Sequence, residues 1–313
     1  MKLISLKEWY GLLVMLTLTG CSNPTESHMA SDADCWRGAG LNQIPVDSAG
    51  MLIRYGRELV SNTSVYLGPN GRVATVSSGM NCQNCHLEAG TKPWGNNYGA
   101  VAAVYPKYRD RSGSIESIEK RVNDCIERSL NGIAIDNNSR EMKAFVAYIK
   151  WLGNEVPKGT TPKGTGIMAL PLLDRAADPV KGKTVYVNTC QRCHGVNGEG
   201  QPNAAGNGYA YPPLWGPHSY NDGAGLYRLS RLAGYVKNNM PDPTSYHAPA
   251  LTDEQAWDVA AFINSQPRPA KDISKDWPDI TKKPFDHPFG PFADSFPAHQ
   301  HKYGPFGDLK KKK

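Results

Sequence analysis

The sequence Cys82-Gln83-Asn84-Cys85-His86 recurs later in the chain as Cys190-Gln191-Arg192-Cys193-His194. In a Cys-x-x-Cys-His motif, the two thiols can form thioethers with the vinyl groups of one haem, and the histidine presents its imidazole to the iron. One such motif alone would also fit a thioredoxin-like redox pair or half of a zinc site. Two motifs in matching local surroundings predict two covalently bound haem c groups. They would be attached through Cys82, Cys85, Cys190 and Cys193 and ligated by His86 and His194.

The N-terminus predicts export. Lys2 and Lys7 precede an apolar run over residues 9 to 20. That run is shorter than the ~20 residues of a membrane-spanning helix, so we predict a signal peptide over residues 1 to 20 and a periplasmic protein. The formal net charge is +6, but the four lysines at 310 to 313 contribute most of it. The remaining charge gives no support to nucleic-acid binding.

The end of the signal predicts lipidation. Leu18-Thr19-Gly20-Cys21 resembles the lipobox of bacterial lipoproteins. Acylation of Cys21 would anchor the protein to a membrane, and Ser22 favours the outer membrane. The alternative is an ordinary secretory signal with an incidental cysteine.

An internal repeat predicts the fold. The segment that begins at Gly56 resembles the one that begins at Gly182, and apolar residues at helical spacing close each copy. We therefore predict an all-α fold of two cytochrome c-type domains in tandem. The expected parts are a signal peptide (1–20), a tether (21–48), the first domain (49–152), a linker (153–178), the second domain (179–266), and an extended strap rich in proline and aromatic residues that ends in a basic tail (267–313).

Two local contacts follow from the repeat. A proline turn comes after each haem motif, at Pro93 and at Pro212. We expect a proline carbonyl in each turn to accept a hydrogen bond from the free ring nitrogen of the axial histidine. Thr252 and Gln255 should form a capping box at the start of the second closing helix.

The repeat also predicts the second axial ligand of each iron. Met240 lies in a segment similar to the methionine loop of small cytochromes c, so it should ligate the second haem. The same distance, counted back from the first closing helix, ends beside Cys125. Met142 and Met80 are weaker candidates, because Met142 lies on an apolar helical stripe and Met80 precedes the haem motif. Cys125 could also be a small core residue or form a disulfide with Cys35.

The surroundings of Cys125 predict anion binding. Arg121 lies four residues before Cys125 and Ser129 four residues after it, on one helical face, and Arg128 is three residues after. Guanidinium groups offer paired donors to sulfonate oxygens. The alternative is that the arginines bind haem propionates or are only solvated. Three further basic residues precede the helix: Lys107, Arg109 and Arg111.

The segment from Arg121 to Gly132, the two haem motifs and the tail segments 290–294 and 301–306 resemble the dihaem thiosulfate dehydrogenases, also called tetrathionate reductases. The resemblance runs from about Gly50 to Phe306. It implies that thiosulfate binds at the first haem, with Cys125 as distal ligand and with Arg111 and Ser129 lining the pocket. A lysine can compete for the second iron in this family. Here Asn239 precedes the methionine and Lys237 is nearby, so Met240 remains the predicted ligand.

The implied activity is the coupling of two thiosulfate ions to tetrathionate, in a reaction that can run backwards. Electrons would pass from the Cys-ligated haem 1 to the His/Met-ligated haem 2, and then to a periplasmic carrier such as a small cytochrome c. Two alternatives remain open at this point. One is a dihaem cytochrome that only transfers electrons, and the other is a subunit of a sulfur-oxidising multienzyme complex.

Overall fold

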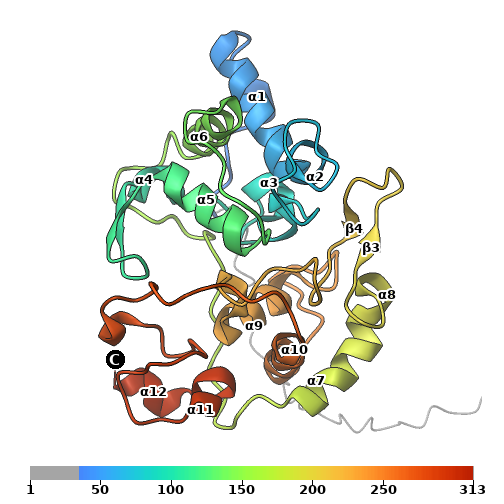
Figure 1. Cartoon of the computed structure of the whole chain (residues 1–313), viewed down its shortest axis with the longest axis vertical. Helices are drawn as coiled ribbons and strands as arrows, with labels where there is room; N and C mark the ends of the chain where they lie inside the picture. The colour runs from blue at the N-terminus through green and yellow to red at the C-terminus, as the bar shows by residue number, and fades with distance from the viewer. Residues whose placement is uncertain (1–34, 313) are drawn as a thin grey trace, which may run out of the picture. The chain divides into compact units, whose positions relative to one another are not determined.

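The computed structural model describes residues 35–312, which all belong to one compact unit (Figure 1). The first domain is framed by two crossing helices, α1 (Ser48–Ser61) and α6 (Arg140–Leu152). They approach closely because residue 56 is a glycine. A Cβ atom at Gly56 would lie only 2.0 Å from the carbonyl oxygen of Ala144. The second domain repeats this crossing between α7 (Pro179–Val185) and α10 (Asp253–Ser265), where a Cβ at Gly182 would lie 1.9 Å from the carbonyl oxygen of Asp258.

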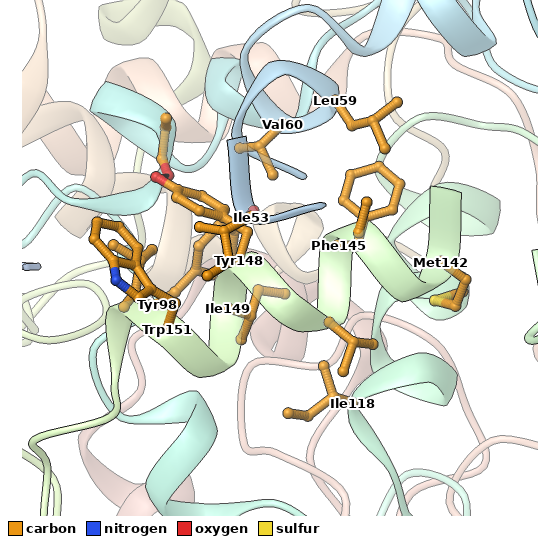
Figure 2. Packing of buried hydrophobic residues seen from close by; sticks show 14 of the residues in the cluster. Ile53, Leu59, Val60, Tyr98, Ile118, Met142, Phe145, Tyr148, Ile149 and Trp151 are labelled. Carbon is orange, nitrogen blue, oxygen red and sulfur yellow. Dashed lines mark hydrogen bonds between the residues drawn. The ribbon is translucent and has the colours of Figure 1, made fainter. Parts of the chain in front are cut away.

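Side chains from α1 and α6 form the first hydrophobic core (Figure 2). Leu59 and Val60 on α1 meet Phe145 and Ile149 on α6, and all four are buried. Met142 is completely buried in the same core. The apolar stripe that predicts this helix in the sequence is therefore a packing surface.

Smaller elements lie between α1 and α6 in the sequence. Helix α5 begins after Ser117, whose hydroxyl accepts a hydrogen bond from the backbone N–H of Lys120. Strands β1 and β2 form a short antiparallel hairpin just before it, in which Arg109 pairs with Ser114. The elements are α2 (Thr63–Leu67), η3 (Cys82–Asn84), α3 (Leu87–Gly90), α4 (Val101–Val104), β1 (Lys107–Arg109), β2 (Ser114–Glu116) and α5 (Ile118–Arg128).

The second domain contains its own core around α7, α9 and α10. The capping box predicted at the start of α10 is confirmed, since Thr252 and Gln255 bond each other's backbone N–H groups. The elements are α7 (Pro179–Val185), the π-helical turn η4 (Tyr186–Cys190), α8 (Gln191–His194), β3 (Gln201–Pro202), β4 (Tyr209–Tyr211), η5 (Gly225–Tyr227), α9 (Leu229–Asn239) and α10 (Asp253–Ser265). The part of the chain that the structure describes is thus helical, with two short hairpins in addition.

The described part of the expected tether packs against the first domain. Ile44 is only 3% exposed in the first core, and η2 (Leu41–Gln43) precedes it. The backbone N–H of Trp36 bonds the carbonyl of Lys163 at 2.8 Å. Residues 35–47 therefore differ from a free tether, because their apolar side chains have a core to join. The signal peptide and Cys21 lie outside the described residues.

The C-terminal segment is more regular than its proline content suggests. It contains η6 (Ile280–Lys282), α11 (Ala298–Tyr303) and α12 (Gly307–Lys311). Proline is tolerated here because Pro297 lies just before the first turn of α11. Phe306 and Leu309 are buried in the core of the second domain. The same segment also reaches the first domain, where the N–H of Trp277 bonds the carbonyl of Arg111 at 2.7 Å.

Candidate functional site

The first haem motif lies at the edge of a cavity. Cys82 begins the short helix η3, and the N–H groups of Cys85 and His86 both bond its carbonyl. The Nδ1 atom of His86 bonds the carbonyl of Asn96. The prediction of a proline carbonyl at the Pro93 turn is therefore wrong in the first domain. The turn continues past Pro93 and presents Asn96 instead.

The cavity has a volume of about 380 Å³. Cys125 on α5 lines it together with the haem motif, and its thiol lies within hydrogen-bonding reach of His86. Met142 and Met80 do not line it. The structure therefore brings His86 and the candidate ligand Cys125 together. The other lining residues include Asn81, Cys82, Cys85, Asn96, Tyr98, Tyr105, Arg109, Ile118, Arg121, Ser129, Phe145, Ile149, Ile167 and Arg231.

The three thiols of this cavity differ in their pKa values. Burial raises the pKa of Cys82 and of Cys85 to about 12. Burial also raises the pKa of Cys125, but the positive charge of Arg121 and a hydrogen bond from His86 outweigh it and lower that pKa to about 7. That hydrogen bond uses the Nε2 atom of His86, which a haem iron would occupy instead. The cavity therefore stabilises a thiolate at Cys125 and at neither of the two attachment positions.

The predicted anion-binding residues separate into two groups. Arg121 and Ser129 line the cavity, as does Arg109. Arg111 does not line it. Its side chain lines a second, much smaller pocket beside Asp276 and Trp277, and burial together with the charges of Arg121 and Arg128 lowers its pKa to about 10.

Arg128 is held by the C-terminal segment. It forms a bidentate ion pair with Asp276, with both N–O distances at 2.8 Å, and it also donates to the carbonyl of Gly223. This pairing differs from the two alternatives considered from the sequence, propionate binding and simple solvation.

Arg231 is a cavity residue that sequence reasoning missed. It lies on α9 of the second domain, far from Cys125 in the sequence, yet its charge interacts with those of Arg109 and Arg121. A signal was available, because Arg231, Tyr235 and Asn239 recur every four residues and form one polar stripe on a helix whose other side is apolar.

The second haem motif has the expected histidine contact. The Nδ1 atom of His194 lies 2.8 Å from the carbonyl oxygen of Pro212, as the sequence predicts. Cys190 and Met240 both pack against the second core. The nearby Lys237 is occupied elsewhere, because its Nζ lies 2.7 Å from the carbonyl of Leu251 and 2.9 Å from a carboxylate oxygen of Asp253.

Comparison with known proteins identifies the family. Residues 73–157 match the SoxA/TsdA cytochrome c domain, and residues 179–267 match cytochrome c. The chain is 38% identical over 239 residues to a thiosulfate dehydrogenase of Psychrobacter arcticus, covering 75% of this chain and 69% of that protein. It is 38% identical over 230 residues to one of Allochromatium vinosum, covering 72% and 82%. This chain belongs to the thiosulfate dehydrogenase family.

A solved structure agrees with this assignment. The thiosulfate dehydrogenase TsdBA of Marichromatium purpuratum superimposes with a TM-score of 0.69 at 31% identity. The match covers 76% of this chain, which spans half of the length of that structure.

Members of this family are dihaem cytochromes, and this chain carries two covalently bound haem c groups. Its residues fit them. The four motif cysteines are free of disulfides, and each motif histidine uses Nδ1 for a backbone carbonyl, which leaves Nε2 for iron. Cys35 and Cys125 are also unpaired, so the disulfide between them is not formed. Among residues 35–312, no helix combines the length and hydrophobicity needed to span a bilayer.

Proposed function

We propose that this protein is a periplasmic cytochrome that couples two thiosulfate ions into tetrathionate at the cavity of Cys125. The observation that carries the proposal is the position of the Cys125 thiol, which lies beside both His86 and Arg121 in one cavity. The proposal also follows from the activity named for the relatives in Psychrobacter arcticus and Allochromatium vinosum.

In this proposal, His86 and Cys125 would hold the iron of haem 1, and His194 and Met240 would hold the iron of haem 2. Each haem would supply a one-electron acceptor, and two such acceptors match the two electrons that one new sulfur–sulfur bond releases. An anionic sulfur ligand favours ferric iron, whereas methionine raises the reduction potential. Electrons would therefore collect at the Met240 side and leave to a small periplasmic cytochrome c or a similar carrier.

The chain's own groups then act on the substrate. The Cys125 sulfur and the terminal sulfur of one thiosulfate form a bond while two electrons leave, which gives a Cys125–S–S–sulfonate adduct. The terminal sulfur of a second thiosulfate attacks the outer sulfur of that adduct. Its electron pair forms the central bond of tetrathionate, and the Cys125 thiolate leaves. The guanidinium of Arg121 and the hydroxyl of Ser129 would bind the sulfonate oxygens.

The same steps in reverse reduce tetrathionate to two thiosulfates, and the haem potentials would set the favoured direction. We further propose export through the signal at residues 1 to 20 and a lipid anchor at Cys21. In that setting the reaction takes place in the periplasm, close to a membrane. Arg111 would act from outside the cavity, since its charge and that of Arg121 repel each other.

The test is Cys125→Ala in the full-length protein carrying both haems. We expect tetrathionate formation with an artificial electron acceptor to fall by at least about a thousandfold, because the nucleophile is lost. The absorbance of haem 1 should change while that of haem 2 stays the same. Cys35→Ala is the matched control, since Cys35 is a buried, unpaired cysteine outside the cavity. Full turnover with normal spectra at both haems would overturn the proposal. A protein that only transfers electrons would show no response of its haem spectra to thiosulfate.

A further inference from the structure

Helix α9 brings a positive charge from the second domain into the cavity of the first. Arg231 lines that cavity, and it is exposed to solvent there. The remaining cationic side chains of the cavity, Arg109 and Arg121, come from β1 and α5. Arg231 is therefore the cavity's one arginine from outside the first domain, within the part of the chain that the structure describes.

The position of Arg231 is fixed by the helix that carries it. One turn further along α9, the hydroxyl of Tyr235 donates to the carbonyl of Asn84 at 2.8 Å, inside the first haem motif. One more turn along, the side-chain amide of Asn239 donates to the carbonyl of Trp94 at 3.2 Å. Tyr235 and Asn239 are both buried. Since these three residues share one face of the helix, the two hydrogen bonds turn Arg231 toward the first haem motif.

Arg231 forms no ion pair with another side chain of the described residues, although the charge of Asp286 acts on it. Its neighbour Arg228 is paired with the buried Asp286 at 2.6 Å, and Arg128 is paired with Asp276. Across residues 35–312, no carboxylate lies within ion-pair distance of Arg231. A guanidinium without a protein carboxylate partner at the wall of this cavity is a binding group for an anion, and the two anions that reach the cavity are the substrate and the propionates of haem 1.

The proposed reaction needs such a group. It joins two dianions, and the second thiosulfate must approach an adduct that already carries a sulfonate. Arg121 lies four residues from Cys125 on α5, so it is placed to hold the sulfonate of the first thiosulfate. A cation on a different wall is required to hold the second sulfonate while its terminal sulfur reaches the adduct.

We propose that Arg231 binds the sulfonate of the second, attacking thiosulfate. The inference rests on the proposed function and adds a residue from the second domain to its substrate site. In this step, the terminal sulfur of the thiosulfate held by Arg231 attacks the outer sulfur of the Cys125 adduct. The central bond of tetrathionate forms, the Cys125–sulfur bond breaks, and no further electrons are exchanged.

The test compares Arg231→Gln, Arg231→Lys and wild type as full-length dihaem proteins. We expect Arg231→Gln to lower kcat/KM for thiosulfate by about tenfold or more, since a charge-assisted hydrogen bond to substrate is lost. Haem reduction in the first half of the turnover should remain fast. The Cys125 adduct should then accumulate at limiting thiosulfate, as measured by mass spectrometry of acid-quenched protein. Arg231→Lys should restore part of the rate, because lysine keeps the positive charge but lacks the paired N–H donors of the guanidinium.

Arg72→Gln is the matched control. It removes the same charge from an exposed residue that does not line the cavity, so we expect unchanged kinetics. Wild-type kinetics in Arg231→Gln would overturn the inference. So would a shifted haem 1 potential with an unchanged KM, since Arg231 would then bind a haem propionate. Failure of the wild-type haems to be reduced by thiosulfate would instead overturn the proposed function. The Kd of tetrathionate for the oxidised protein, from calorimetry, tests Arg231 independently of turnover, and we expect a rise of about tenfold in Arg231→Gln.

Discussion

The ion pair between Arg128 and Asp276 joins the C-terminal segment to the end of α5, the helix that carries Cys125. Arg128 lies at the end of α5, one turn after Cys125, and Asp276 comes from the segment after the second domain. The side chains are only 11% and 12% exposed. Asp276→Asn would leave a buried guanidinium without its counter-ion, close to the charges of Arg111.

The expected cost follows from this burial. Breaking a buried pair by removing one partner costs about 3–5 kcal/mol, and the partial exposure of this pair places the estimate at about 3 kcal/mol. The free energy of unfolding, measured with guanidinium chloride and far-UV circular dichroism, should fall by that amount in Asp276→Asn. The double variant Arg128→Met/Asp276→Leu should recover part of it, because no unpaired charge remains.

Asp308→Asn is the matched control for this prediction. Asp308 also lies in the C-terminal segment and pairs with Lys311, but these side chains are 73% and 80% exposed. Its replacement should change the stability by less than about 0.5 kcal/mol. A loss of stability in Asp276→Asn no greater than in Asp308→Asn would show that the buried pair does not fix the segment to α5.

Two further predictions concern stability. Gly56→Ala should lower the free energy of unfolding by about 2 kcal/mol, because separating α1 from α6 costs more than the ~1 kcal/mol that alanine adds to a helix. Gly225→Ala is the control, since a Cβ there would meet nothing within 4 Å. A Gly56→Ala protein as stable as wild type in denaturant titrations would contradict the close crossing. Burial and, to a smaller extent, the charge of Lys283 lower the pKa of His287 from 6.5 to about 4. The folded protein therefore favours neutral His287, and the unfolded chain binds this proton more readily, so protonation below pH 6.5 destabilises the fold. Stability should fall by about 2 kcal/mol between pH 7 and pH 5, and His287→Gln should flatten this decline; an equal decline in both proteins would refute it.

The sequence predicts those features that depend only on residues close together in the chain. Covalent haem attachment needs two thiols and an imidazole within five residues, so the motifs are visible without a fold. The repeat predicts a place for Cys125 near the first haem motif, and both line one cavity. The close helix crossing at Gly56 is copied at Gly182. The histidine contact to Pro212 follows from the repeat as well. In the first domain the corresponding contact moved to Asn96, since the carbonyl that meets Nδ1 depends on how the turn is packed.

Contacts between distant segments could not be predicted in this way. Arg111 and Arg121 are ten positions apart and both precede Cys125, yet only Arg121 lines the cavity. What separates them is the C-terminal segment, whose Trp277 binds the backbone of Arg111. No periodic pattern in the sequence predicts the hydrogen bond between Trp277 and Arg111. Tertiary contacts of this kind decide which of several basic residues reaches the cavity of Cys125.

Helix α9 shows why the two domains form one catalytic unit in the proposed mechanism. Its first turn carries Arg231 at the cavity of Cys125, and the residue directly after its last turn is Met240, the proposed ligand of haem 2. Between them, Tyr235 bonds the backbone of the first haem motif. A displacement of α9 would therefore change the substrate site and the environment of the second iron together. For the same reason, electron exit and the binding of the second thiosulfate should respond jointly to substitutions on the face of α9 that carries Tyr235.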